Sequence, residues 1–117
     1  MNITPESLFA ALTHPLRLRA VVLLAGEDEL CVCELTHVLD AAQPTVSRHL
    51  AQLREAGVVE DRRQGLWIYY HLHPRLPDWA LAVIRETAAG VGRGTPFAAD
   101  RESLAAMPDR PGGRCCA

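Results

Sequence analysis

The chain has 117 residues, of which 49% are hydrophobic and 22% are charged, and its formal net charge is −2. This size and balance favour one globular domain. The net charge argues against a broadly basic surface, but a local basic patch is still available from Arg48, Arg54, Arg62 and Arg63. No apolar run approaches the roughly 18 residues of a membrane span, and the first five residues lack a secretion signal. We therefore expect a cytoplasmic protein that does not enter a membrane.

Hydrophobic spacing and helix-capping residues predict a mainly α-helical chain with one β-hairpin. Thr4-Pro5 is typical of a helix start, and Gly26 and Gly57 are typical of helix ends. A polar turn is expected over 27–30, and Gln64-Gly65 is expected to form the hairpin turn. The expected elements, in chain order, are helices over 5–12, 16–26, 32–39 and from 43 to Gly57, strands over 58–62 and 66–72, and a last helix over 77–89.

Two helices joined by a three-residue turn and followed by a hairpin predict a winged helix-turn-helix of the α+β class. In that fold the second helix enters the major groove of double-stranded DNA with polar residues near its N-terminus, and the wing reaches the neighbouring backbone. The alternative for each side chain is a merely solvated face. The candidate DNA-binding residues are Gln43, Thr45, Ser47, Arg48 and His49 on the helix, and Arg62, Arg63 and Gln64 on the wing.

Three segments resemble one known family, the ArsR/SmtB metalloregulatory repressors. Residues 41–59 resemble its recognition helix, 63–70 its wing, and 12–18 its opening segment. The resemblance covers about residues 5–90. It implies a homodimeric repressor of operator DNA, with the first and last helices at the dimer interface. One departure is Ala42, where the family commonly has Ser or Thr; this removes a helix cap worth about 1 kcal/mol, which Asp40 could replace in part.

Glycine and proline become dense from Gly90 onward, which favours a mobile tail. We therefore expect a DNA-binding and dimerisation domain over 1–90 and a flexible Gly/Pro-rich tail over 91–117 that ends in a cysteine pair. A short helical turn around 100–107 is an alternative for part of this tail.

The four cysteines are Cys31, Cys33, Cys115 and Cys116. Residues so close in sequence would close strained disulfide rings, so thiolate chemistry or ion binding is the better interpretation in a reducing compartment. The segment 29–35 resembles the site of arsenic- and antimony-responsive members of the family and of related cadmium and lead sensors. Thiolates are soft ligands, so the implied inducer is As(III) or Sb(III), and no organic cofactor is expected.

The spacing of Cys31 and Cys33 suggests a switch. In a regular helix, residues i and i+2 point about 200° apart, so two such thiols cannot grip one ion. In an extended or loosened turn they share a side, so ion binding would favour a distorted start of the third helix. Distortion would misplace the recognition helix. The arsenic-responsive pattern commonly carries a third cysteine where this chain has Thr36. Cys115 and Cys116 could supply that ligand, form a site of their own, or have an incidental or redox role.

Other functions remain as alternatives. A thiol redox-sensing repressor or a Cd/Pb sensor would keep the same DNA-binding half, and a winged-helix protein-interaction module would not touch DNA. The last helix has no histidine, which disfavours a zinc sensor of the kind that uses that helix. We do not expect an enzyme, because a redox Cys-x-x-Cys, a phosphate-binding glycine loop and a nucleophile elbow are missing from the sequence.

Overall fold

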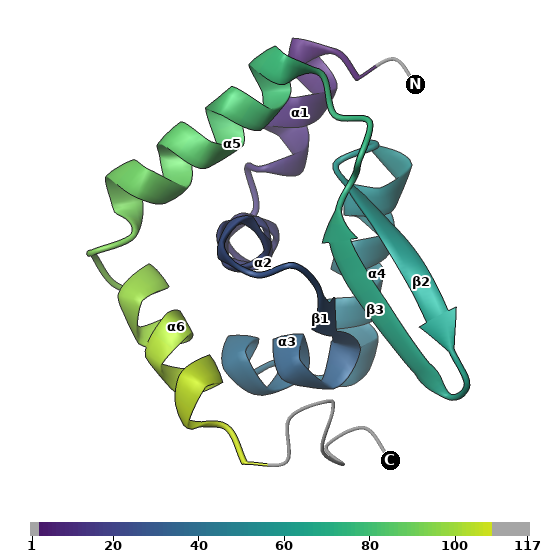
Figure 1. Ribbon diagram of the computed structural model, residues 1–117, viewed down its shortest axis with the longest axis vertical. Helices are drawn as coiled ribbons and strands as arrows, with labels where there is room; N and C mark the ends of the chain where they lie inside the picture. The colour runs from purple at the N-terminus through teal and green to yellow at the C-terminus, as the bar shows by residue number, and fades with distance from the viewer. Residues whose placement is uncertain (1–2, 109–117) are drawn as a thin grey trace.

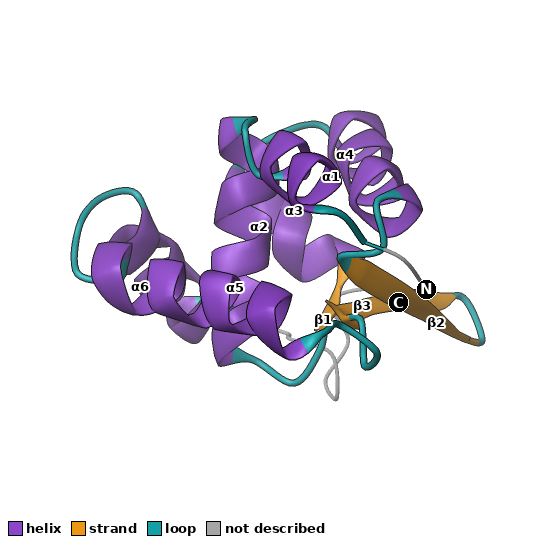
Figure 2. Cartoon of the chain, turned by 90° about the horizontal axis from the view of Figure 1, so that it is seen from above, coloured by secondary structure: helices purple, strands orange, loops and turns teal. Residues whose placement is uncertain are grey.

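The computed structural model describes residues 3–108. Helix α2 (Pro15–Gly26) runs through the middle of the molecule, and the other helices surround it (Figure 1). The hairpin of β2 (Val59–Gln64) and β3 (Trp67–Leu72) extends away from the helices (Figure 2). The elements are α1 (Pro5–Ala11), α2 (Pro15–Gly26), β1 (Leu30–Cys31), α3 (Val32–Leu39), α4 (Gln43–Glu55), β2 (Val59–Gln64), β3 (Trp67–Leu72), α5 (Asp78–Val91) and α6 (Phe97–Ala106).

The helix boundaries follow local capping chemistry. The Thr4 hydroxyl accepts from the Ser7 amide and the Ser7 hydroxyl accepts from the Thr4 amide, which completes a capping box before α1. At the end of α4, Gly57 takes a left-handed φ of 83°. The Val58 and Gly57 amides then donate to the carbonyls of Leu53 and Arg54, the two bonds of a Schellman motif. The predicted start of α1 and end of α4 are confirmed.

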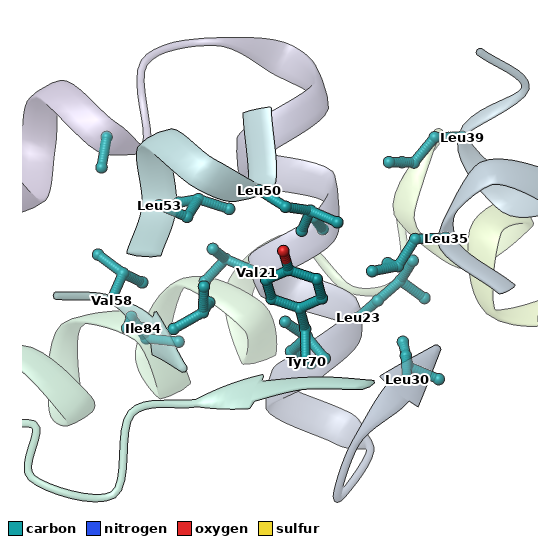
Figure 3. Close-up of a cluster of buried hydrophobic side chains, with 14 of the residues drawn as sticks. Val21, Leu23, Leu30, Leu35, Leu39, Leu50, Leu53, Val58, Tyr70 and Ile84 are labelled. Carbon is teal, nitrogen blue, oxygen red and sulfur yellow. The ribbon is translucent and has the colours of Figure 1, made fainter. Parts of the chain in front are cut away.

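The core forms where α2 meets the other elements. Five consecutive residues of α2, 20–24, are buried. Buried side chains from α3, α4, α5 and β3 pack around this helix, as Figure 3 shows for Leu35, Leu50, Ile84 and Tyr70. Burying each such apolar side chain contributes roughly 1.5–3 kcal/mol, so this packing fixes α3 and α4 relative to each other.

The antiparallel sheet has the strand order β1-β3-β2 and contains one strand that the sequence did not predict. The expected polar turn over 27–30 ends instead in β1, whose Leu30 and Cys31 pair with Tyr70 and Tyr69. The hairpin turn also differs by one residue. It is formed by Gly65 and Leu66, because Gln64 already pairs with Trp67. Gly65 has a φ of 63°, as a type II′ turn requires at its first central position.

Residues 97–106 are helical, in a part of the chain for which the sequence favoured a flexible tail and gave a short helical turn around 100–107 as the alternative. They form α6, which packs against α2 and α3 through the buried Leu104. The Asp100 carboxylate is only 4% exposed and accepts from the Arg19 guanidinium at 2.8 and 2.9 Å. Arg19 also donates to the Val38 carbonyl of α3 at 3.3 Å. The hydrogen bond to Asp100 raises the pKa of Arg19 above its ordinary value.

The predicted cysteine pair Cys115 and Cys116 lies outside the described residues. Within residues 3–108, no single helix is long and apolar enough to cross a membrane, although α1 and α2, bent by 103°, meet that test as a pair.

We expect Asp100→Ala to lower the free energy of unfolding by about 2 kcal/mol, because it leaves the Arg19 guanidinium without its charged partner. Urea denaturation followed by circular dichroism measures this. Glu102→Ala is the matched control, since Glu102 is an exposed acid on the same helix; it should change stability by less than about 0.5 kcal/mol. Equal effects of the two substitutions would mean that the ion pair does not anchor α6.

Candidate nucleic-acid interface and thiol site

Helix α4 presents different residues on its different faces. Val46, Leu50 and Leu53 are buried and hold the helix on the core. Gln43 and Arg48 are exposed, so both are accessible to a groove or a phosphate. The Gln43 amide donates to the Ser47 hydroxyl at 2.9 Å, while Thr45 and Ser47 are half-buried.

The start of α4 lacks a side-chain cap, as expected for Ala42. Asp40, the residue that could have replaced the cap, is the C-cap residue of α3 with a left-handed φ of 50°. Asp tolerates this conformation better than most residues do. The turn between the two helices is therefore sharp, and the first amides of α4 have no hydrogen bond from the Ala42 side chain.

His49 lies on the flank of α4 that faces the junction of α1 and α2. Its ring centroid is 4.1 Å from that of His14, and its Nδ1 is 3.1 Å from Nη1 of Arg17. Arg17 also donates to the Gln52 side chain and to the Ala11 carbonyl, the latter at 2.7 Å. The sequence predicted His49 as a DNA contact, and in the structure it ties the recognition helix to the N-terminal helices.

The surroundings of His49 disfavour its protonation. Burial of the ring lowers the pKa of His49 below 6.5, and the positive charges of His14, Arg17 and Arg48 lower it further. A hydrogen bond with Gln52 acts in the opposite direction but does not reverse the shift.

The wing arginines differ in their partners. Arg62 donates to the Glu29 carboxylate through Nε at 3.2 Å, and its guanidinium carbon lies 4.7 Å from the centre of the Tyr69 ring. The hydrogen bond between Arg62 and Glu29 raises the pKa of Arg62 and lowers the pKa of Glu29. Arg62 also donates to the Gln64 side chain at 2.7 Å. Arg63 is exposed and forms no ion pair with any residue of the described range 3–108.

Cys31 and Cys33 lie together at the start of α3, where Cys31 is the N-cap residue with extended backbone angles. Their Sγ atoms are 2.8 Å apart, and we refer to them as the sulfur pair. Cys31 Sγ accepts from the Cys33 amide at 3.3 Å, and the buried Glu34 carboxylate accepts from the Cys31 amide at 2.8 Å. The extended backbone of Cys31 brings the two sulfurs to the same side, as the sequence predicts for an extended turn. Helix α3 itself need not be distorted for this contact, because Cys31 precedes its first turn.

A cavity of about 650 Å³ connects the sulfur pair with the recognition helix and the wing. Thr36 is one of its lining residues, and the Thr36 hydroxyl is buried without a hydrogen-bond partner within the described part of the chain. Burial also raises the pKa of Tyr70, which is another lining residue. The lining residues are Cys31, Val32, Cys33, Thr36 and His37 from β1 and α3, Gln43, Ser47, Ala51 and Arg54 from α4, and Leu66, Trp67, Ile68 and Tyr70 from the wing.

The two sulfur atoms of Cys31 and Cys33 are donors of the type that suits a soft ion. Two adjacent sulfurs are ligands that thiophilic ions prefer over hard cations. Within residues 3–108, no group of three or more His, Cys, Asp or Glu side chains is arranged to hold a metal. Sequence reasoning missed Glu29, Arg17 and the aromatic wall at Trp67, because their partners are distant in the sequence.

A helix pair followed by a paired hairpin defines a winged-helix transcriptional regulator, and the comparisons with known proteins agree. A family model described as "Bacterial regulatory protein, arsR family" matches residues 14–61. The fold matches that of the transcriptional repressor BigR from Xylella fastidiosa with a TM-score of 0.60 and 34% identity, over 75% of this chain and 82% of that one.

Two curated relatives are more similar in sequence. The chain is 54% identical over 83 residues to the arsenic resistance transcriptional regulator ArsR1 of Pseudomonas putida, covering 71% of this chain and 65% of that protein. It is 50% identical over 82 residues to the arsenical resistance operon repressor of Escherichia coli, covering 70% of each. The chain thus spans just under two thirds of the Pseudomonas relative. It belongs to the ArsR family of bacterial regulatory proteins, and both of these relatives are regulators of transcription.

The environment of His49 predicts a pH dependence of stability. Its pKa is lower in the folded state than in the unfolded state, so the unfolded state binds more protons between those values, and stability falls as the pH falls below about 6.5. We expect the melting temperature of His49→Gln to fall less than that of the unmodified chain between about pH 7.5 and pH 5.5. Thermal unfolding at both pH values measures this. His37→Gln changes an exposed histidine of α3 and should leave the dependence as it was. If the His49 variant and the unmodified chain showed the same pH dependence, the lowered pKa of His49 would not be its cause.

Proposed function

We propose that this protein is a cytoplasmic, homodimeric repressor that leaves its operator when trivalent arsenic or antimony binds Cys31 and Cys33. The observation that carries the proposal is the position of the sulfur pair. It forms one wall of a cavity whose other walls are the recognition helix and the wing. The names of the curated relatives, an arsenic resistance regulator and an arsenical resistance operon repressor, support the same inducer.

DNA recognition is assigned to α4 and the wing tip. Gln43 and Arg48 are the exposed groups able to read base edges or phosphates, and Thr45 and Ser47 stand beside them. On the wing, Arg63 and Gln64 are exposed. Two further candidates already have partners within the protein. Arg62 on the wing would have to exchange Glu29 for a phosphate, and His49 on the flank of α4 would have to turn away from Arg17. An exposed ion pair contributes only about 0–1 kcal/mol, so such an exchange costs little.

The inducer acts through Cys31, because this residue ends β1 and also caps α3. Its sulfur accepts the first amide hydrogen bond of α3, and its backbone pairs with Tyr69 of the wing strand. Bonds from Cys31 and Cys33 to an ion would change both the hydrogen bond that caps α3 and the pairing of Cys31 with Tyr69. Release requires that the ion bind the DNA-free conformation more tightly than the DNA-bound one.

The homodimer is proposed to form through α1 and α5. Phe9 on α1 is 54% exposed and Trp79 on α5 is 40% exposed, so each helix offers a large apolar side chain to a partner.

Cys115 and Cys116 are proposed as a source of the third ligand, from the same subunit or from its partner.

The decisive experiment is a fluorescence anisotropy titration on the promoter of the protein's own transcription unit, under reducing conditions. Arsenite or antimonite should release the unmodified protein, and Cys31→Ser/Cys33→Ser should stay bound. Cys115→Ser/Cys116→Ser keeps the sulfur pair and tests the tail, because loss of release in this variant would identify the tail cysteines as the source of the third ligand. Cadmium and lead are added separately.

Each alternative predicts a different outcome. Release by peroxide but by no ion would favour a redox-sensing repressor, and release by cadmium or lead alone would favour a sensor of those metals. Failure of the unmodified protein to bind the promoter would remove the repressor function itself.

We expect Arg48→Ala and Arg63→Ala each to weaken operator binding. A lost phosphate contact lowers the slope of log K against log salt by about 1, and a lost base contact costs about 1–3 kcal/mol. Anisotropy at several salt concentrations separates these two roles. Arg101→Ala is the control, because Arg101 is an exposed arginine on α6, which is not among the elements proposed to contact DNA or a partner subunit. A comparable loss in the control would mean that DNA binding depends on overall charge.

A further inference from the structure

We propose that Glu29 withholds Arg62 from the operator backbone and thereby lowers the affinity of the wing for DNA. The inference rests on the proposed function, because it concerns how the same wing meets the operator. It makes Glu29 a residue that sets DNA affinity without touching the DNA itself.

Glu29 and Arg62 meet across the full width of the sheet. Glu29 immediately precedes β1, Arg62 lies on β2, and β3 runs between these two strands. The guanidinium of Arg62 lies over β3, with its Cζ atom 4.7 Å from the centre of the Tyr69 ring. There its Nε donates to Oε2 of Glu29 at 3.2 Å, and its Nη2 donates to Oε1 of the same carboxylate. Such a two-fold contact fixes the orientation of an arginine as well as its position.

A third hydrogen bond keeps the Arg62 head group on the protein. Its Nη1 donates to the Gln64 side chain at 2.7 Å, so all three guanidinium nitrogens are engaged within the chain. The neighbouring Arg63 is exposed and forms no ion pair with any residue of the range 3–108. Successive residues of a strand point to opposite faces of the sheet, so the two arginines lie on different faces of the hairpin. The wing therefore carries one arginine that is available to phosphate and one that is held back.

The held arginine is accessible enough to exchange its partner. The side chain of Arg62 is 44% exposed and that of Glu29 is 32% exposed. A phosphate offers arginine the same two-fold geometry as a carboxylate, so it competes directly for the guanidinium. When Arg62 turns to a phosphate, Glu29 loses its partner and adds a negative charge beside the DNA backbone. Both the lost ion pair and this repulsion oppose operator binding.

The test is Glu29→Gln, which keeps the size of the side chain and removes its charge. Anisotropy with the promoter fragment, on the full-length reduced protein without inducer, measures the affinity. We expect binding about two- to fivefold tighter for each wing, the factor by which an exposed ion pair shifts an equilibrium. A dimer that binds with both wings gains this factor twice. The slope of log K against log salt should become steeper by up to about 1 for each wing, because Arg62 then neutralises a phosphate.

Two further variants locate the effect. Asp28→Asn is the matched control, because it removes the same charge from the adjacent residue, which is exposed and forms no ion pair within residues 3–108. It should change the affinity by less than about twofold, since salt screens an exposed charge that lacks a direct contact. In an Arg62→Ala background, Glu29→Gln should have no effect, because the two residues act through one contact.

A gain of affinity cannot come from partial unfolding, so the expected result is not open to that explanation. Unchanged or weaker binding by Glu29→Gln would overturn the inference, and weaker binding would mean that Glu29 positions Arg62 for the DNA instead. An equal gain in Asp28→Asn, or a gain that persists in the Arg62→Ala background, would also overturn it, since either would trace the effect to overall charge. All of these outcomes leave the proposed function intact. If the unmodified protein does not bind the promoter, the proposed function fails and the inference fails with it.

Discussion

The pairing of Leu30 and Cys31 with Tyr70 and Tyr69 is the contact on which the site depends. It makes Cys31 the last residue of a strand and the cap of a helix at once, so the start of α3 is fixed to the wing strand β3. Helix α4 follows after a short turn and packs on the same core. The sulfur pair, helix α4 and the wing are consequently connected through the start of α3. An ion bound to the sulfurs, as proposed above, would act where these parts join.

Ion pairs divide the arginines of the basic stretch into two groups. Arg54 is paired with Asp61 at 3.2 Å and Arg62 with Glu29. Arg48 and Arg63 have no acidic partner within residues 3–108 and are exposed. Although the net charge of the chain is −2, Arg48 and Arg63 are therefore exposed cations that a phosphate could approach. The paired arginines can join them, because exposed ion pairs exchange at low cost.

Elements set by neighbouring residues were predictable, and elements set by distant partners were not. The capping box at Thr4 and the glycine stop at Gly57 are local signals, so the helices α1 to α5 were found within a few residues. Strand β1 exists only because β3 lies beside it. Helix α6 lies among glycines and prolines that suggest a mobile tail, but burial of Leu104 and the partnership of Asp100 with Arg19 hold it on the core.

The sequence by itself determined the winged-helix pattern, the polar residues that α4 and the wing carry, and the presence of two closely spaced cysteines. These follow from periodicity, turn chemistry and residue type, which act over a few residues. Only the tertiary structure decided that the two sulfurs meet without distorting α3, that His49 faces Arg17, and that an apolar cavity joins the sulfur pair to the recognition helix. Each of these depends on side chains from elements far apart in the chain, which come together only when α2 is buried and the sheet has formed.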